Sequence, residues 1–531
     1  MNINSENNYD HIAYSDQIKR LTQIGKALSA EKNIDRLLEV ILDEAQKYTY
    51  ADGGTIYIMS DDEAELLFAI IRNEFLGVHM GGSGGKITWP AVKLINTDGS
   101  PNYSNVSAYV AISGETVNIS DVYNAKGFNF EGTKEFDQET GYHSKSMLVV
   151  PMRNHENEII GVLQLLNAKD HTTGTVIDFS PQAQEMAISL ASQAAVALSN
   201  NILIHDLENL LESFIKTIAT AIDEKSPYTG GHIRRVAELT MFIAEKINER
   251  KQGKFAVVNF SEDQLRELRI AAWLHDIGKI TTPEHVVSKA TKLEIVYDLI
   301  NDIKIRIELI KRDYLLAGGS NVKNKQEQNI VSKENIEKEI SKLDDEYRFL
   351  KEINNKSDLI GDEEIARIKQ IASRQWKVDG KTFTLLTEAE INNLSIRYGT
   401  LNDEERGIIN NHAAVTYKML SQLPFPKKMR RIAEYAAAHH EKLDGSGYPL
   451  GLKDEQLSLQ SRIIALADIF EALTAQDRPY KQGKTLSEAL KTMEMMVHDH
   501  HIDGDLYELF VKEKIYSDYA KRELAQQQID V

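Results

Sequence analysis

One long continuous helix is predicted near the middle of the chain. Residues 182–225 contain neither proline nor glycine, the two residues that most strongly interrupt helices. In this part of the chain, apolar residues recur at steps of three, four or seven positions, as they do in coiled coils. They are Ala197, Ile204, Leu207, Leu211, Phe214, Ile218 and Ala221. The pattern predicts a linker helix over 181–225. It favours a parallel coiled coil between two copies of the chain over a helix packed on its own domains.

The linker helix separates two regions with different hydrophobic patterns. With 531 residues the chain is too long for a single core, so separate domains are expected on the two sides. Before the linker, amphipathic helical stretches flank short apolar and β-branched runs that alternate with turns. The runs are TIYIM, ELLFAI, AYVAIS, TVNIS, SMLVVPM and EIIGVLQLLN. After an N-terminal tail at 1–19, they predict an α+β domain over 20–200, with an antiparallel sheet backed by helices.

The C-terminal region, residues 212–531, has a helical pattern almost throughout. Its segment from about 291 to 400 is polar, rich in lysine and glutamate, and contains two long periodic runs. The runs are LEIVYDLINDIKIRIELIKRDYLL and NIEKEISKLDDEYRFLKEIN. We expect an all-α domain that carries this segment as a helical insertion. The sequence leaves three roles open for the insertion: a lid over a pocket, a surface for a protein partner, or a spacer.

The composition limits the ligands and partners that the chain can have. It contains no cysteine, so a metal ion would have to be held by histidine and carboxylate. The formal net charge of −18 argues against DNA binding, although a small phosphate ester could bind at a local site of metal and arginine. No apolar run approaches the roughly 20 residues of a membrane span, and the N-terminus lacks a signal-peptide pattern. A cytoplasmic location without membrane attachment is expected.

Seven histidine and aspartate residues of the C-terminal region stand in apolar helical contexts. They are His232, His275, Asp276, His412, His439, His440 and Asp468. A single histidine in a helix is more often a hydrogen-bonded core residue than a metal ligand. Together with two carboxylates, however, this set would be costly to bury unpaired, and imidazole with carboxylate suits divalent first-row metals. The set suffices for two six-coordinate ions if one carboxylate bridges them and water fills the remaining positions.

The order of these residues, H…HD…D, resembles the HD superfamily of metal-dependent phosphohydrolases. HHEKLDGSGYP, from His439, and ALADIFEALTAQDRPYK, from Ala465, are similar to the HD-GYP subgroup. Its known members hydrolyse cyclic di-GMP and, in some cases, 3′,3′-cyclic GMP-AMP. In the first domain, TGYHSKSMLVVPM followed by EIIGVLQLLNAKD resembles a GAF domain, a small-molecule sensory module.

The HD-GYP resemblance implies a role for each candidate ligand. Asp276 would bridge two divalent ions. One ion would be completed by His232, His275 and Asp468, and the other by His412, His439 and His440. Asp276 and Lys279 would be the catalytic residues, with Lys279 contacting the scissile phosphate and supporting the leaving oxygen. We expect iron or manganese, with zinc, magnesium, nickel and cobalt as alternatives.

The loop after the histidine pair is the expected substrate contact. Gly445 and Gly447 would allow backbone to approach the substrate, and Tyr448 offers a ring to a guanine or ribose. Arg478 and Lys481 match positions at which the family grips phosphates. The predicted substrate-binding set is Lys279, Asp444, Gly445, Gly447, Tyr448, Arg478 and Lys481.

The chain departs from the family pattern at two positions. Some members hold a third metal with a glutamate four residues before the first histidine, where this chain has Tyr228. We therefore predict a binuclear site, with Glu224 as a reserve ligand. Glu471 stands where many members have aspartate, and a structural role is expected for it. Four further histidines match no ligand position: His285, His498, His500 and His501.

Together these features predict a dimeric signalling enzyme, a GAF sensor joined by a helix to an HD-GYP phosphodiesterase. It would open cyclic di-GMP or 3′,3′-cyclic GMP-AMP to a linear dinucleotide or mononucleotides. A non-catalytic cyclic-dinucleotide receptor and a nucleotide phosphohydrolase of the wider superfamily are the alternatives. The second copy would pair through the GAF domain and linker helix, and a protein partner could bind the insertion. NAKGFNF at Asn124 and FDQE at Phe136 only loosely echo cyclic-nucleotide-binding GAF domains, so the GAF ligand is unknown.

Overall fold

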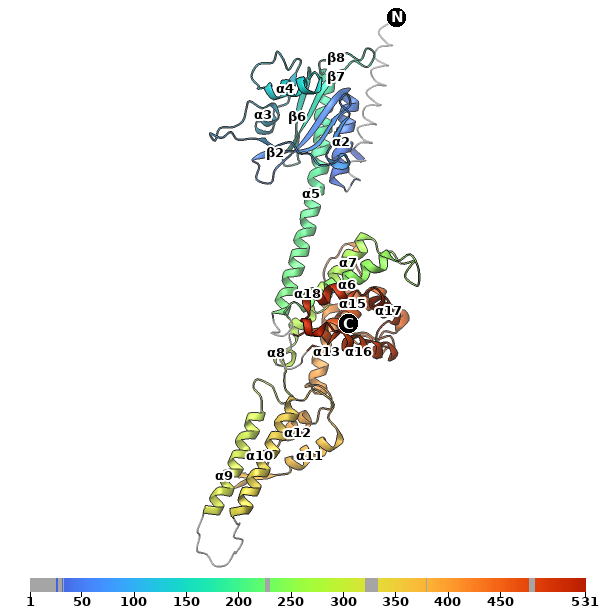
Figure 1. Ribbon diagram of the computed structural model, residues 1–531. Coiled ribbons are helices and arrows are strands. Elements are labelled where there is room, and N and C mark those ends of the chain that lie inside the picture. The colour runs from blue at the N-terminus through green and yellow to red at the C-terminus, as the bar shows by residue number, and fades with distance from the viewer. Residues whose placement is uncertain are drawn as a thin grey trace, which may run out of the picture. The chain divides into compact units, whose positions relative to one another are not determined.

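The computed structural model describes residues 25–26, 31, 33–224, 230–319, 333–378, 380–476 and 483–531 (Figure 1). The chain divides into two compact units, Met1–Leu210 and Leu211–Val531. The described part of the first unit contains a sheet flanked by helices, whereas that of the second is almost wholly helical. The predicted order of an α+β domain followed by a helical region is confirmed.

The first unit is built on an antiparallel sheet with the strand order β3-β2-β1-β7-β6-β5. Two short strands lie off this path, β4 beside β2 and β8 beside β7. The strands are β1 (Ala51–Met59), β2 (Glu65–Asn73), β3 (Val78–Met80), β4 (Val92–Lys93), β5 (Val117–Ile119), β6 (Met147–Arg153), β7 (Ile159–Lys169) and β8 (Val176–Ile177).

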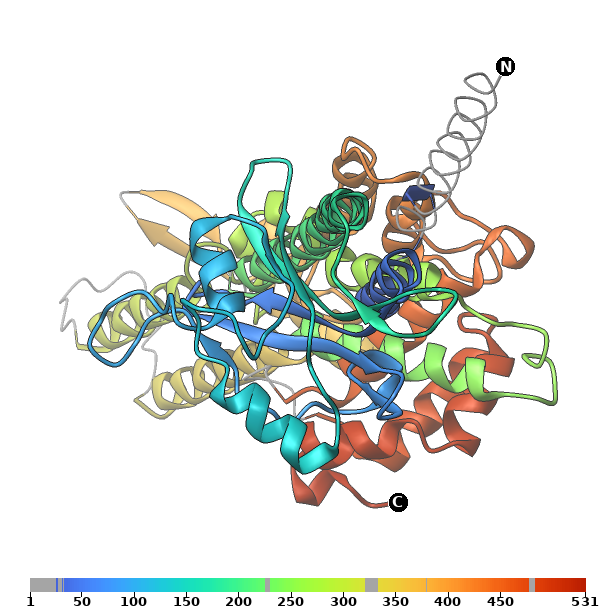
Figure 2. The same ribbon diagram turned by 90° about the horizontal axis from the view of Figure 1, so that it is seen from above.

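Alternate strand residues enter two different cores, because successive side chains of a strand point to opposite faces. Leu148 and Leu163 pack with α2 (Ile34–Thr49) and the first part of α5 (Pro181–Asp223). These two helices lie along the same side of the sheet (Figures 1 and 2). The neighbouring residues Val149 and Val162 pack instead with α3 (Val106–Ser113), and α4 (Glu131–Thr140) lies further along the chain.

The run AYVAIS was expected to be a strand, and that prediction is wrong. It forms most of α3, which begins after Asn105 and ends before Gly114. The Asn105 side chain accepts a hydrogen bond from the Ala108 N–H, and Gly114 adopts the left-handed conformation that commonly ends a helix. These two caps, rather than the β-branched composition between them, determine the local structure.

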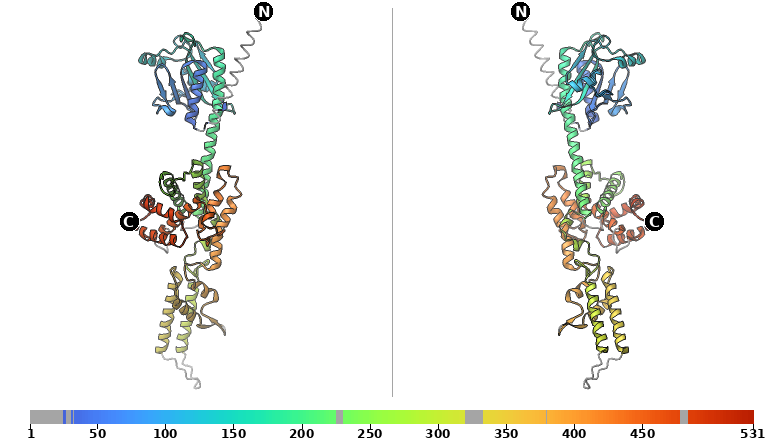
Figure 3. Two further views of the ribbon diagram at one scale, coloured as in Figure 1. Left: turned by 90° about the vertical axis from the view of Figure 1, so that its right-hand side faces the viewer. Right: turned by 90° about the vertical axis from the view of Figure 1, so that its left-hand side faces the viewer.

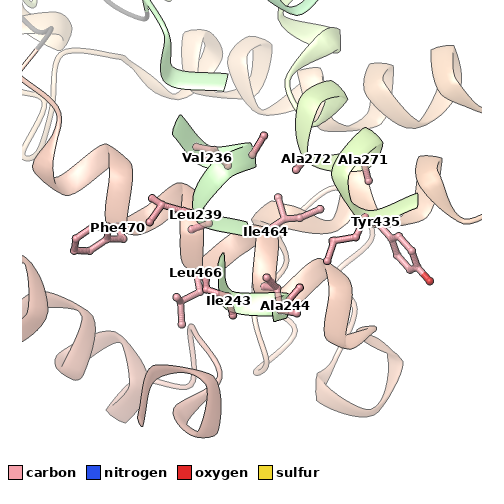
Figure 4. Packing of buried hydrophobic residues seen from close by; sticks show 14 of the residues in the cluster. Val236, Leu239, Ile243, Ala244, Ala271, Ala272, Tyr435, Ile464, Leu466 and Phe470 are labelled. Atoms are coloured by element: carbon pink, nitrogen blue, oxygen red, sulfur yellow. The ribbon is translucent and has the colours of Figure 1, made fainter. Parts of the chain in front are cut away.

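The second unit has a core formed by helices from distant parts of the sequence. Side chains of α6 (His232–Glu249), α7 (Glu262–Leu274), α14 (Ile432–Ala437) and α15 (Leu459–Thr474) meet in it (Figure 4). The remaining helices of this region are α8 (Glu284–Val287), α13 (Asp403–Leu420), α16 (Leu486–His498), α17 (Gly504–Lys512) and α18 (Tyr516–Glu523). This packing brings residues more than two hundred positions apart in the sequence into one core.

The insertion has a core of its own, separate from that of the surrounding domain. Figure 3 shows its helices α9 (Ile300–Gly319) and α10 (Lys333–Asn355) side by side, and α11 (Asp362–Ala372) and α12 (Glu388–Leu394) follow. Two details differ from the expected all-helical insertion. Helix α9 begins at Ile300 rather than at Leu293, and β9 (Gln375–Val378) forms a hairpin with β10 (Lys381–Thr384).

The two ends of the insertion are tied together by buried polar contacts. Lys289 donates hydrogen bonds to both carboxylate oxygens of Glu405, at 2.7 and 2.8 Å. The Thr400 hydroxyl donates to the carbonyl of Lys289 at 3.2 Å. The Lys292 ammonium donates to the carbonyls of Ile396 and Gly399 at 2.6 and 2.9 Å. The chain therefore leaves the insertion close to the point at which it enters.

Helix α5 buries apolar residues at both ends and exposes others in between. Residues from Met186 to Leu198 pack into the core of the first unit, and Ile215, Ala219 and Ile222 into that of the second. The predicted heptad residues Ile204, Leu207, Leu211, Phe214 and Ile218 are 57, 57, 38, 58 and 42% exposed. By length and apolarity α5 also passes a test for membrane spans, as core helices of other proteins do.

Candidate metal centre

Five segments of the second unit carry the seven candidate ligands. His232 begins α6, and His275 and Asp276 join α7 to the 3-10 turn η2 (Ile277–Thr281). His412 lies in α13, His439 and His440 lie in the 3-10 turn η4 (Ala438–His440) after α14, and Asp468 lies in α15.

The turn after Asp276 packs directly against α13. Thr416 accepts a hydrogen bond from the Gly278 N–H at 3.0 Å, and its hydroxyl donates to the carbonyl of His275 at 3.1 Å. A Cβ atom at Gly278 would lie 2.0 Å from the carbonyl oxygen of His412, so only glycine permits this approach. The turn thereby positions His275 and Asp276 against the helix that carries His412.

The two carboxylate oxygens of Asp276 face different histidines. Oδ2 lies 3.6 Å from Nε2 of His232 and 3.4 Å from Nε2 of His275. Oδ1 lies 3.3 Å from Nε2 of His412 and 3.9 Å from Nε2 of His439. One carboxylate therefore joins two groups of ligand atoms, each compact enough for one ion, with atoms within 4.8 Å of one another. The groups are His232, His275 and Asp276, and His412, His439 and His440.

Asp468 lies beside the first of these groups. Its Oδ1 atom is 3.3 Å from Nε2 of His232 and 3.9 Å from Nε2 of His275. His440 belongs to the second group, with its ring centre 4.0 Å from that of His439 and 5.1 Å from that of His412. The structure thus brings all seven predicted ligands together.

Backbone hydrogen bonds orient three of the five imidazoles. The Nδ1 atoms of His275, His412 and His439 lie 2.6 to 2.7 Å from the carbonyl three residues earlier in the chain. A carbonyl can only accept, so each Nδ1 carries the proton, and each Nε2 presents a lone pair. This tautomer is the one that a neutral histidine uses to bind a metal through Nε2.

The atoms that face one another in this centre lack hydrogen bonds. Among the described residues, the Nε2 atoms of His275, His412 and His439 and Oδ1 of Asp276 are buried without a hydrogen-bond partner. Buried polar atoms are rarely left unsatisfied, because each costs free energy. Several such atoms, all of them acceptors, converge on Asp276, and a cation would satisfy them together. The residues present therefore fit divalent metal ions.

Burial and neighbouring charges set the protonation states. Burial lowers the pKa of His440 to about 3, and burial with the charge of His440 holds the pKa of His439 well below its usual range. Burial alone would raise the pKa of Asp276, but the nearby Lys279 and His275 charges hold it well below its usual range. At neutral pH His439 and His440 are therefore neutral and Asp276 is ionised, as metal binding requires.

Glu471 contacts a ligand rather than the ion space. Its buried carboxylate accepts a hydrogen bond from Nδ1 of His232 and another from Nε of Arg235 at 2.7 Å. Burial alone would lower the pKa of His232, but the Glu471 charge and hydrogen bonds raise it well above its usual range. Sequence reasoning expected a structural role for Glu471 and missed Arg235, which lies three residues after His232 on the same helix.

The predicted substrate residues are partly placed. The Lys279 ammonium is 2.5 Å from Oδ2 of Asp276, and the Tyr448 ring lies 4.8 Å from that of His440 at an interplanar angle of 36°. The exposed Asp444 accepts hydrogen bonds from the N–H and hydroxyl of Ser446 in its own loop. Arg478 and Lys481, like Tyr228, lie outside the described residues.

The glycines of the loop serve the loop itself. Gly445 has a φ of 83°, and a Cβ atom at Gly447 would lie 2.4 Å from the backbone nitrogen of Lys442. Both positions therefore require glycine for chain geometry. A further residue that sequence reasoning missed is the buried Glu441, which accepts hydrogen bonds from the N–H groups of Leu450, Gly451 and Leu452 at 2.6, 3.2 and 2.9 Å.

The reserve ligand Glu224 and the four histidines without a ligand position are not part of either described ligand group. Glu224 and His285 are exposed, and so are His498 and His500, while His501 is half-buried. Burial lowers the pKa of His501, with smaller effects from Lys442 and Asp444, so this side chain lies near the substrate loop. Among the described residues, neither compact ligand group includes any of these five.

The first unit contains a cavity of about 760 Å³. One wall is a row of aromatic rings in mutual contact, Phe68, Trp89 and Phe136, with edge-on packing at Trp89. Gln164 also lines it, and its Oε1 accepts hydrogen bonds from the hydroxyls of Tyr57 and Ser107. Asn124 is not among the described lining residues, and its side chain bonds to Asp121.

Comparison with known proteins places recognised domains on both units. A family model described as GAF domain matches residues 33–198, and two models described as HD domain match residues 229–372 and 388–506. The chain therefore contains a GAF domain followed by an HD domain, as the resemblances predicted. The solved GAF domain of Acinetobacter phosphoenolpyruvate-protein phosphotransferase aligns with 15% identity and a TM-score of 0.27, over 36% of this chain and 97% of that one.

Curated relatives match parts of this chain. The 3′3′-cGAMP-specific phosphodiesterase 3 of Vibrio cholerae is 45% identical over 101 residues, 19% of this chain and 21% of the relative. The cyclic di-GMP phosphodiesterase of Thermotoga maritima is 37% identical over 134 residues, 24% of this chain and 34% of the relative. The chain thus spans only about a fifth to a third of the length of these relatives.

Proposed function

We propose that this protein is a metal-dependent phosphodiesterase that hydrolyses a cyclic dinucleotide, cyclic di-GMP or 3′,3′-cyclic GMP-AMP, under control of its GAF domain. The observation that carries the proposal is the position of Asp276, whose two oxygens face two separate histidine groups. The names of the matched relatives, which are phosphodiesterases for these two substrates, support the same reaction. An intact ligand set disfavours the receptor alternative.

The proposed centre holds two divalent ions. His232, His275 and Asp468 would hold one, His412, His439 and His440 the other, and Asp276 would bridge them. When bound, such ions activate water and neutralise charge on a phosphodiester. Iron or manganese is expected, because nitrogen and carboxylate ligands suit both and no thiolate is available. The HD domain implies a divalent metal ion, and iron or manganese is our proposal for it.

The side chains around the centre would bind and orient the substrate. Lys279 places a partly exposed positive charge beside Asp276, where it would donate a hydrogen bond to the scissile phosphate and stabilise the leaving oxygen. Tyr448 presents a ring beside that of His440, a suitable platform for a guanine base. Asp276 is kept ionised by its neighbours and so does not compete for the proton that the leaving group needs.

The test is product analysis with a matched histidine control. Full-length protein, purified without oxygen and loaded with iron or manganese, should convert cyclic di-GMP or 3′,3′-cyclic GMP-AMP to a linear dinucleotide or mononucleotides. Asp276→Ala should abolish turnover, whereas His285→Ala should leave it unchanged, since His285 is exposed and outside both ligand groups. Metal-loaded protein that binds the dinucleotide without product would support the receptor alternative. Hydrolysis of nucleoside phosphates alone would support the nucleotide phosphohydrolase.

The GAF cavity suits a planar ligand that is neutral or anionic. Its described lining includes four aromatic rings and six carboxamides, with Arg72 and Lys93 but no carboxylate. Arg72 pairs with the buried Glu39 behind the lining at 3.0 Å, so among the described lining residues Lys93 is the unpaired positive charge expected to face an anionic ligand. A full-length thermal-shift screen of neutral, anionic and cationic heterocycles would test this, with Trp89→Phe as the site variant. Stabilisation by cationic heterocycles alone, or stabilisation that Trp89→Phe leaves unchanged, would contradict it.

A further inference from the structure

The two halves of the candidate metal centre differ in charge. The carboxylate subsite, formed by His232, His275 and Asp468, has an aspartate oxygen 3.3 and 3.9 Å from its two imidazole nitrogens. The imidazole subsite, formed by His412, His439 and His440, consists of histidines alone. The shared Asp276 gives one oxygen to each subsite, so it does not remove the difference. A divalent cation therefore gains more Coulomb energy in the carboxylate subsite.

The hydrogen bonds behind the ligands increase this difference. In the imidazole subsite, the Nδ1 protons of His412 and His439 are donated to neutral backbone carbonyls. In the carboxylate subsite, His232 instead donates its Nδ1 proton to the Glu471 carboxylate. A carboxylate partner makes an imidazole a stronger metal ligand than a carbonyl partner does. His232 is thus the most electron-rich of the histidines whose Nδ1 contacts are described.

Arg235 fixes the orientation of this carboxylate. It donates to Oε1 of Glu471 at 2.7 Å, while Oε2 meets His232. The glutamate is only 1% exposed, so its two oxygens are held in these separate roles. Lys279 offsets part of the charge of Asp276 Oδ2, but its side chain is 25% exposed, whereas Asp468 is fixed beside both imidazoles. The carboxylate subsite stays the more anionic of the two.

We propose that the carboxylate subsite binds its ion first and at least tenfold more tightly than the imidazole subsite, and that Glu471, positioned by Arg235, sets part of this difference. The inference rests on the metal binding of the proposed function but not on the identity of the substrate. Glu471 acts through His232 and is a positioning residue. The imidazole subsite would then be the one from which the ion exchanges.

The experiment is a manganese titration of the metal-free full chain. Calorimetry and electron paramagnetic resonance monitor the binding steps. Two resolved binding steps are expected, with the signal of an isolated ion after the first and of a coupled pair after the second. Glu471→Gln, which keeps the shape and removes the charge, should weaken the first step about 10- to 100-fold and the second by less. The matched control is Glu390→Gln, which removes a buried carboxylate that pairs with Arg306 in the insertion. It should leave both binding steps unchanged.

Two ligand variants keep the proposal testable if Glu471→Gln does not fold. Asp468→Asn should remove the tight step, and His440→Ala should remove the weak step and spare the tight one. Two equal binding steps in the unmodified protein would overturn the proposal, as would a loss of the tight step in His440→Ala. Equal weakening of both steps by a folded Glu471→Gln would overturn the role of Glu471. Ordered loading of a protein that hydrolyses no cyclic dinucleotide would contradict the proposed function alone.

Discussion

Glu441 holds the backbone of the loop that follows Tyr448. Its carboxylate accepts three N–H groups from the loop that follows Tyr448, so it fixes the course of the predicted substrate contact. Glu441→Gln loses the charge and presents a donor where an acceptor is needed. We expect a fall in unfolding free energy of about 1–3 kcal/mol and a larger rise in KM than fall in kcat. Steady-state kinetics and chemical denaturation measure both, and the exposed Glu455→Gln should change neither.

Tyr448 is expected to act through its ring rather than its hydroxyl. The half-buried ring lies 4.8 Å from that of His440 at an interplanar angle of 36°, and we expect a base to stack on it. Stacking of a base on an aromatic ring contributes about 1–3 kcal/mol. Tyr448→Phe should therefore keep KM within about threefold, whereas Tyr448→Ala should raise it about tenfold or more. Equal effects of the two substitutions would assign the contribution to the hydroxyl.

The candidate ligands were predictable from sequence because each brings rare polar chemistry to an apolar helix. Their grouping in space agrees with that prediction, although the role of each as a ligand stays a prediction. The supporting residues were harder to find. Glu441 bonds to groups nine to eleven positions later in an irregular loop, and Arg235 acts on a glutamate 236 positions away. No periodicity or spacing in the sequence indicates such contacts.

Among the elements, the segment that opens the insertion carries a buried cation. Burial lowers the pKa of Lys292 to about 8, and its ammonium donates to two carbonyls. An unfolded lysine keeps its proton up to a pKa of about 10.4. Between these values the unfolded chain binds more protons than the folded chain, so rising pH favours folding.

Lys292→Met should remove this pH dependence. The free energy of unfolding of the unmodified protein, relative to the variant, should rise between pH 8 and pH 10 by up to about 1.4 kcal/mol per unit. Below pH 8 the difference should be constant. Lys304→Met, at an exposed position of α9, is the control and should behave like the unmodified protein. Parallel curves for Lys292→Met and the unmodified protein would contradict this account.

Element types were predicted best where one periodicity dominates. The linker was expected over 181–225, and α5 covers Pro181–Asp223. The prediction failed for AYVAIS, where two capping residues outweigh β-branched composition, and it missed the β9-β10 hairpin, whose two strands are short and whose described residues are mostly exposed. Period-two alternation is informative where one face is buried over several residues, and here strands of four residues place only Trp376 against the described insertion core.

At the scale of the whole molecule, the exposed apolar residues of α5 predict that the protein is a dimer. We infer that Ile204, Leu207, Leu211, Phe214 and Ile218 pair with the same residues of a second copy, because their three- and four-residue spacing is that of a coiled-coil seam. Replacing Leu207 and Phe214 together by glutamate should convert a dimer to a monomer. Light scattering after size exclusion would show the change.

The control for this prediction is Val257→Glu, at an apolar position that is 93% exposed and outside the row. That variant should stay dimeric. A monomeric unmodified protein at micromolar concentration, or a double variant that stays dimeric, would contradict the coiled coil. If the GAF ligand acts through this pairing, the double variant should also lose any response of hydrolysis to that ligand.

The hydrogen bond between Thr400 and Lys289 has a consequence for how the metal centre forms. Bringing His412 to Asp276 requires the closure of a loop that contains the whole insertion, and an unstructured loop costs entropy that grows with the logarithm of its length. The insertion has its own core and its ends meet, so if it folds first, most of that loop is ordered when the two ligands join. The insertion then adds little to the entropy cost of bringing His412 to Asp276. A short glycine-serine bridge in its place should leave manganese binding intact.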